Sequence, residues 1–334
     1  MLLSQLCLME ERLKIAADDE FCCGMVYWPE LSHGDTFSIE FFADNTRTPL
    51  EMSLEDRTLK FCRDRYGEKS DNMVDIWNEL HKLTKLFPWS TQKQNIGNTH
   101  YVEQQLDTYY WLKNSRICGE KHCFAGFDID AAMSLKENMV VLLEKLATID
   151  YENNEFLKRD MYDIARTVMM RFIAIMMYKT VRMLNDGDYK DADDLVKYKD
   201  STIELFNCLS ELLSSNDEYS LYKTYTDLFE VSEVNPVFEY TLKKNVTCEY
   251  NRTHVAELVD SIYIPETLKF FDIIRKNIGN NIKTIEYLEE LEQFRNENLK
   301  KFYDCPLRDM QKTSERDFRK SVYSAINVLK CMPR

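Results

Sequence analysis

Glycine and proline are scarce in this chain, and that scarcity restricts its possible folds more than any other sequence feature. The 334 residues include 8 glycines and 7 prolines, whereas average usage of about 7% and 5% would supply roughly 40. Turn-rich β-sandwiches and nucleotide-binding folds that depend on glycine-rich loops therefore fit poorly. We expect a chain made mainly of helices.

From Ser53 onward, apolar residues recur with the period of an α-helix. The breaks are brief and polar; Gly67 is expected to end the first helix, and Gly187 to end the longest. The predicted fold class is all-α, a multi-helix array or bundle. The pattern predicts helices over 54–66, 72–87, 101–113, 130–148, 155–185, 189–214, 217–230, 234–249, 253–277, 281–303 and 312–330.

The run Val168–Met177 is apolar on almost every side. A helix of this kind normally lies at the centre of a bundle, where methionine fills irregular gaps. The run is too short to cross a bilayer, which takes about 20 apolar residues, and it contains Arg171. We therefore expect a core helix, and no membrane span.

Residues 1–50 differ in style from the rest of the chain. A helix is expected over Leu3–Ala16, and Gly24–Glu30 is predicted to be a short buried strand that ends in an acidic loop. The segment is rich in apolar residues that need cover, while a short strand leaves its edge unpaired. We predict two parts, 1–50 and 51–334, and association of the first part with a partner or with a second copy.

Charge and targeting signals restrict the classes of partner. The net charge is −14, so the chain has no general attraction for nucleic acid or anionic lipid. Met1–Met9 lacks the basic region of a signal peptide. The two N-x-Thr sequons, at Asn245 and Asn251, are interpreted as chance occurrences, which leaves the compartment open.

The ten cysteines are too dilute for a disulfide scaffold and are interpreted mainly as buried, reduced thiols. Adjacent Cys22 and Cys23 cannot bridge each other in helix or strand geometry. Cys118, His122 and Cys123 offer at most three ligands from one loop, whereas structural zinc normally takes four. We expect no metal and no cofactor there; reduced thiols or one local disulfide remain the alternatives.

Carboxylates are the other candidate chemistry. Glu30 ends the predicted strand, and Glu40 and Asp44 follow it; a retaining glycosidase needs two carboxyl groups about 5–5.5 Å apart. For any single acid in so acidic a chain, a solvated surface position is the ordinary alternative. Asp163 and Arg166, three residues apart on a helix, are predicted to form a partly buried structural ion pair.

Several stretches together resemble the C-terminal part of α-N-acetylglucosaminidases, glycoside hydrolase family 89. Their order and spacing agree from about residue 29 to 330, and the stretch beginning at Asp160 is similar to the family pattern D-x-x-D-[LI]-x-R. The stretches are Pro29–Glu30, Phe37–Ala43, Phe61–Gly67, Trp77–Leu80, Asp160–Arg166, Leu212–Leu221 and Leu258–Pro265.

The resemblance implies that residues 1–50 are a remnant of the end of a (β/α) barrel and that the rest is the all-helical domain. It places Glu30 at the catalytic nucleophile, implies a glycan containing N-acetylglucosamine as substrate, and suggests a lysosomal or secreted protein. A barrel needs roughly 250 residues, so we expect this chain alone to be inactive and to require a barrel chain. The alternative is a non-catalytic interaction or scaffold protein derived from that domain.

Overall fold

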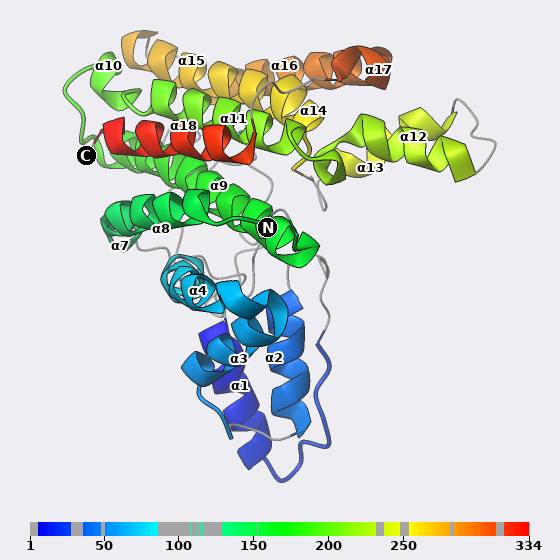
Figure 1. The fold of residues 1–334 in the computed structure, drawn as a ribbon. Helices are drawn as coiled ribbons and strands as arrows, with labels where there is room; N and C mark the ends of the chain where they lie inside the picture. The colour runs from blue at the N-terminus through cyan, green and yellow to red at the C-terminus, as the bar shows by residue number, and fades with distance from the viewer. Residues whose placement is uncertain are drawn as a thin grey trace. The chain divides into compact units, whose positions relative to one another are not determined.

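The computed structural model describes residues 6–27, 36–47, 51–85, 108, 112, 115, 129–151, 153–231, 237–247, 254–280, 284–311 and 317–333. Every regular element within them is helical (Figure 1). The all-α prediction is therefore confirmed.

The predicted strand over 24–30 is wrong where it can be examined. Residues 24–27 have no regular structure, and 28–30 lie outside the described residues. Val26 is 89% exposed. A lone strand has no ladder to satisfy its backbone groups, and no strand occurs among the described residues to supply one. Residues 36–47, which the resemblance places near the last barrel strands, form a helix. The barrel remnant is thus not seen in the described part of 1–50.

The chain divides into two compact units. The first comprises residues 1–93 and 126–168, and the second comprises 94–125 and 169–334. One long helix, α9 (Glu155–Asp186), contributes its first turns to one unit and its remainder to the other. This division follows packing within the chain, so the predicted boundary between residues 50 and 51, which rests on the barrel resemblance, stays a prediction.

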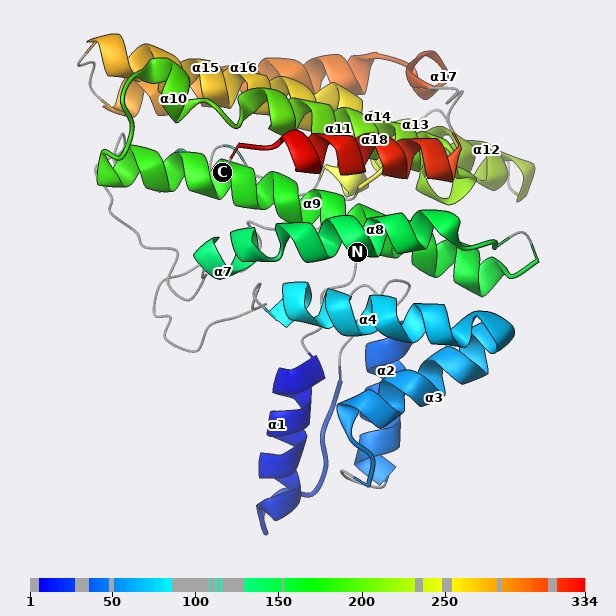
Figure 2. The same ribbon diagram turned by 60° about the vertical axis from the view of Figure 1, so that its left-hand side comes forward.

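The first unit holds α1 to α4, α7, α8 and the start of α9. Helix α1 contacts α2, α3 and α4, while α4 packs against α8 (Figures 1 and 2). An aromatic core joins α2, α3 and α4. The ring of Phe37 stacks on that of Phe61 with centroids 4.5 Å apart, and it lies edge-on to Trp77 with centroids 5.4 Å apart. The bounds are α1 Leu6–Asp18, α2 Thr36–Arg47, α3 Leu54–Tyr66, α4 Ser70–Lys85, α7 Ile129–Ser134 and α8 Lys136–Thr148.

The second unit holds the rest of α9 and the C-terminal helices. Helices α11 and α18 lie side by side in both views, as do α15 and α16 (Figures 1 and 2). A π-helical turn, Val259–Tyr263, joins α14 to α15. The bounds are α10 Ala192–Leu195, α11 Lys199–Ser214, α12 Leu221–Val231, α13 Val237–Val246, α14 Ala256–Leu258, α15 Ile264–Asn280, α16 Thr284–Asp304, α17 Leu307–Met310 and α18 Phe318–Cys331.

Two glycines end helices as predicted. Gly67 follows α3 with φ of 58°, and Gly187 follows α9 with φ of 73°, a backbone region that other residues rarely adopt. The amide of Asp188 then donates to the carbonyl of Met183 at 3.0 Å, which closes the end of α9. These stops set the lengths of α3 and α9.

The apolar run 168–177 of α9 is buried in the core of the protein. Every residue from Val168 to Met177 is buried, and Arg171 is 1% exposed. The prediction of a core helix is confirmed. Among the described residues, no helix is both long enough and apolar enough to cross a membrane.

Candidate functional site

Two sets of predicted site residues cannot be placed. Glu30, the nucleophile position implied by the resemblance, lies outside the described residues, as do Cys118, His122 and Cys123. Within the described ranges, no group of three or more His, Cys, Asp or Glu side chains is arranged to hold a metal ion.

The first unit holds a largely buried polar group, the Asp160 cluster, which we define as Arg65, Tyr66, Trp77 and Asp160. The Asp160 carboxylate accepts hydrogen bonds from Arg65 Nε and, at 3.0 Å, from Arg65 Nη2. The Tyr66 hydroxyl donates to Asp160 Oδ2 at 2.8 Å and accepts from Trp77 Nε1 at 3.0 Å. The chain of donors joins α3, α4 and α9.

Burial determines what the Asp160 cluster can do chemically. Asp160 is 6% exposed and Tyr66 3%, and burial, followed by the charge of Asp160, raises the pKa of the Tyr66 hydroxyl well above its usual value. The same two causes raise the pKa of the nearby Cys62 thiol to about 12. Both groups therefore stay protonated at neutral pH, and the cluster acts as an internal anchor.

The cation of this cluster is held by rings as well as by charge. The Arg65 guanidinium lies 4.8 Å from the ring centroid of Phe156 and 5.6 Å from that of Phe61. A guanidinium between aromatic faces is positioned by the ring quadrupoles and loses little freedom when it binds a carboxylate. Arg65 is therefore positioned by two rings in addition to the carboxylate of Asp160.

His81 faces the same aromatic core from the next turn of α4. Its ring lies 5.7 Å from Phe37 and 5.8 Å from Trp77 between centroids, and its Nε2 is buried without a hydrogen-bond partner. Burial lowers the pKa of His81 to about 4, because desolvation among the aromatic rings disfavours the charged imidazolium. The side chain is neutral at physiological pH.

The predicted pair of Asp163 and Arg166 is present on α9. Arg166 Nη2 lies 2.5 Å from Asp163 Oδ1, with the side chains 12% and 5% exposed respectively. The backbone carbonyl of Asp163 also accepts from the Thr167 hydroxyl at 2.6 Å. The pair is part of the packed interior and leaves no accessible carboxylate.

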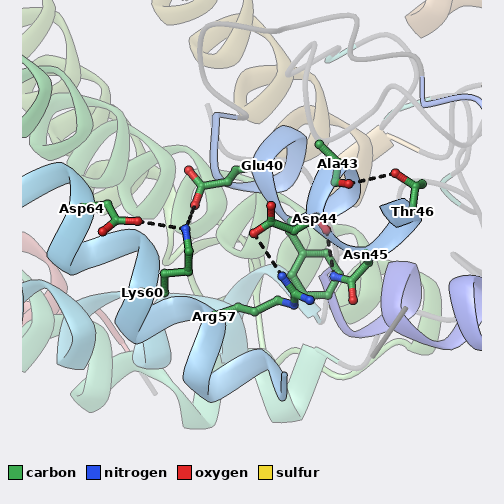
Figure 3. A network of polar contacts seen from close by, with 9 residues as sticks. Glu40, Ala43, Asp44, Asn45, Thr46, Arg57, Lys60 and Asp64 are labelled. Carbon is green, nitrogen blue, oxygen red and sulfur yellow. Dashed lines mark hydrogen bonds and ion pairs between the residues drawn. The ribbon is translucent and has the colours of Figure 1, made fainter. Parts of the chain in front are cut away.

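The acids of α2 that we considered as catalytic partners are ion-paired with α3 (Figure 3). Arg57 Nη1 lies 3.1 Å from Asp44 Oδ2, and Lys60 Nζ lies 3.6 Å from Glu40 Oε1. Lys60 also donates to Asp64 at 2.8 Å, and that hydrogen bond is the largest cause of the raised pKa of Lys60. These contacts fasten α2 to α3 near the surface.

Two aromatic clusters, Tyr27–Trp28 and Tyr109–Trp111, have rings of the kind that can stack on sugars, and most of their members lie outside the described residues. Trp28 and the stretch 109–111 are not described. Tyr27 is placed: its hydroxyl donates to Ser38 Oγ at 3.0 Å, and its ring lies 5.1 Å from that of Phe42. Tyr27 thus packs on α2.

In the second unit, Glu257 closes the start of α12. Its carboxylate accepts from the Ser220 hydroxyl at 2.9 Å and from the amides of Leu221 and Tyr222 at 3.0 and 2.9 Å. A helix begins with amides that lack partners in their own helix, and a carboxylate there is also favoured by the helix dipole. Sequence patterns missed this cap because the acid lies 36 residues away from Leu221.

Lys243 of α13 donates hydrogen bonds to backbone carbonyls at the C-terminal end of α16. It is 1% exposed, its Nζ donates to the carbonyls of Tyr303 and Cys305 at 3.3 and 2.5 Å, and Glu239 lies 2.8 Å away. Glu239 in turn accepts from the Leu307 amide at 2.8 Å. The buried lysine therefore satisfies carbonyls that the helix leaves open.

The buried carboxylates of the described part share one property. Four are buried, and each has a fixed donor beside it: Asp160 and Asp163 as above, Glu257 at the start of α12, and Glu266, whose Oε2 lies 3.4 Å from Arg295 Nε. The arrangement can hold helices together, and none of these four buried carboxyl groups is free for acid–base chemistry.

Comparison of the chain with models of protein families, with curated proteins and with solved structures found no match.

Proposed function

We propose that this chain is a helical module that is not catalytic by itself and is equivalent to the C-terminal domain of an α-N-acetylglucosaminidase-like glycoside hydrolase. The lack of catalysis is supported by one observation: all four buried carboxylates in the described part are paired with donors inside the protein. General acid catalysis needs a carboxyl group free to reach the glycosidic oxygen. A module of this kind works by binding a barrel chain that supplies the acid.

The equivalence rests on the sequence motifs, and their placement supports a structural role for them. Three of the quoted stretches, Phe61–Gly67, Trp77–Leu80 and Asp160–Arg166, meet in the Asp160 cluster. Another, Leu212–Leu221, ends at the start of α12, which is capped by Glu257, the residue just before the stretch that begins at Leu258. Motifs that assemble a helical framework are those a domain keeps when the catalytic residues lie on another part of the enzyme.

An activity assay tests the first half. Pure protein incubated with an aryl α-N-acetylglucosaminide should release no more aryl alcohol than buffer does, because in this proposal a separate barrel chain supplies the acid/base carboxyl. Turnover that disappears in Glu30→Gln and persists in Glu20→Gln would contradict the proposal, since Glu20 is an exposed acid of the same segment.

The coding sequence upstream of Met1 tests the second half. A reading frame for a (β/α) barrel of roughly 250 residues, whose product co-purifies with this chain and restores turnover, is the expected result. A neighbouring frame of unrelated composition, with no turnover from the combined products, removes the equivalence and leaves the second candidate below.

The second candidate is self-association through residues 1–50, as a scaffold protein. It is favoured by the apolar side chains that α1 and the following loop expose: Ile15 is 63% exposed, Phe21 82% and Val26 89%. Apolar side chains that gather within twelve residues indicate a contact surface more strongly than scattered ones. In this proposal the occupant of that surface is a second copy of the chain.

Sedimentation at several protein concentrations tests this candidate. We expect dimers that dissociate in the double variant Phe21→Ser, Val26→Ser and persist in the control Val141→Ser, because Val141 is 50% exposed on α8 of the same unit. A monodisperse monomer at every concentration would rule out self-association.

A further inference from the structure

The loop that follows α1 presents two adjacent thiols to solvent. Cys22 and Cys23 are both free and exposed. The loop turns at Asp19, whose carboxylate accepts from the Phe21 amide at 2.9 Å and whose carbonyl accepts from the Cys22 amide at 3.0 Å. The two cysteines therefore leave the turn together, and both side chains are exposed with respect to the described part of the chain.

A bridge between neighbours closes a strained ring, because consecutive Cα atoms lie about 3.8 Å apart whereas disulfides usually span about 4.4–6.8 Å, and such a bond is more easily reduced. It also needs a backbone that lets the two side chains approach. In a strand, successive side chains point to opposite faces, and in a helix they diverge by about 100°. Residues 22–27 are neither helix nor strand. Gly24 comes next, and a Cβ built on it would meet nothing within 4 Å, so the loop has room to adjust.

The thiols are also held only weakly where they are. Cys22 Sγ lies 3.5 Å from the carbonyl of Gly24, and Cys23 Sγ lies 3.7 Å from the carbonyl of Phe21. A thiol is a weak donor, so exchanging these contacts for water when the side chains rotate costs little. The only hydrogen bonds shown for the two thiols in the described part of the chain are therefore weak ones that rotation of the side chains can break.

We propose that Cys22 and Cys23 form a reversible dithiol–disulfide site on this loop. A small-molecule disulfide is the oxidant: one thiolate attacks it and releases one small thiol, and the neighbouring thiolate then attacks the mixed disulfide and releases the second. One S–S bond forms within the chain and one S–S bond of the oxidant is broken. The two cysteine sulfurs lose two electrons, which the departing thiols carry together with the two protons.

The other described cysteines are unsuited to this reaction. Cys62 and Cys208 are buried, and Cys305 and Cys331 are free thiols with no adjacent cysteine in the sequence. Thiol–disulfide exchange needs access and a second thiol within reach. Exposed Cys331 should therefore stop at a mixed disulfide, which makes it an internal control.

Trypsin separates the two cases. Cleavage after Lys14 and Arg47 releases residues 15–47, which contain Cys22 and Cys23 and no other cysteine, and cleavage after Lys330 releases residues 331–334 with Cys331 alone. The folded full-length chain is treated with oxidised glutathione, and the remaining thiols are then alkylated under denaturing conditions. After tryptic digestion, the peptide masses are measured by mass spectrometry.

The expected result is a 15–47 peptide that is two hydrogen atoms lighter and carries no alkyl group, beside a 331–334 peptide that carries glutathione. In Cys22→Ser or Cys23→Ser, the remaining thiol should keep one glutathione. A wild-type 15–47 peptide recovered with two alkyl groups, with two glutathiones, or cross-linked to another peptide would overturn the proposal. Because the readout needs no activity, it is independent of the proposed function.

Discussion

Replacing Asp160 by asparagine keeps the shape of the side chain and removes its charge, so it measures what the Asp160 cluster contributes to stability. The change leaves the Arg65 guanidinium, 15% exposed, without a carboxylate, and it turns an amide group toward donors. Removing one partner of a buried ion pair costs about 3–5 kcal/mol, because the other charge stays buried and uncompensated.

Urea unfolding, followed by circular dichroism, converts this cost into a midpoint. With a slope of about 2–3 kcal/mol per molar urea, the midpoint of Asp160→Asn should fall by roughly 1–2.5 M. The matched control is Asp75→Asn in the same unit, where Asp75 and Lys145 lie 2.8 Å apart but are 63% and 47% exposed. An exposed pair contributes less than about 1 kcal/mol.

Tyr66→Phe, made alone and together with Asp160→Asn, completes a double-mutant cycle. The hydroxyl donates to the same carboxylate at 2.8 Å, so the two losses should be smaller in combination than their sum. The reasoning is refuted if Asp160→Asn and Asp75→Asn have the same midpoint and slope, or if the cycle shows strict additivity.

Two other perturbations follow from the same unit. Arg166→Ala should cost about 3–5 kcal/mol in urea unfolding, whereas Lys82→Ala, which breaks an exposed pair with Glu79 at the same spacing, should cost less than about 1 kcal/mol; equal costs would mean that the Asp163–Arg166 pair is not effectively buried. His81 has a pKa of about 4 in the folded state and about 6.5 in the unfolded state. Between these two pH values the unfolded chain binds a proton that the folded chain does not bind, so the free energy of unfolding decreases as the pH falls from about 6.5 to about 4. Measured at pH 6.5 and pH 5, wild type should lose about 1.5 kcal/mol more than His81→Leu does, and parallel losses in the two proteins would show that His81 does not carry this dependence.

The helices and their ends are the part of this fold that local sequence determines. Glycine after Tyr66 and after Asp186 supplies the positive φ that stops a helix, and the predicted range 54–66 is the observed α3. The Asp163–Arg166 pair could likewise be predicted, because its partners are three residues apart on one helix. Each of these features depends on residues within one or two helical turns.

The segment 1–50 shows where local patterns mislead. Apolar residues at 24–30 and 37–43 suit a strand as well as a buried helix when the run is short. Packing decided the outcome: Phe37 and Phe41 are buried as part of α2, while residues 24–27 have no neighbouring strand among the described residues and form an irregular loop.

Only tertiary structure determined the partners of the remaining buried charges. Asp160 meets Arg65 across 95 positions in the sequence, Glu257 caps a helix 36 residues before it, and Lys243 reaches carbonyls 60 and 62 residues ahead. A buried charge must find a counter-charge or a helix end to offset the loss of water. Any acid or base of suitable length can satisfy that demand, so which one does so depends on how the helices pack and leaves no periodic mark on the sequence.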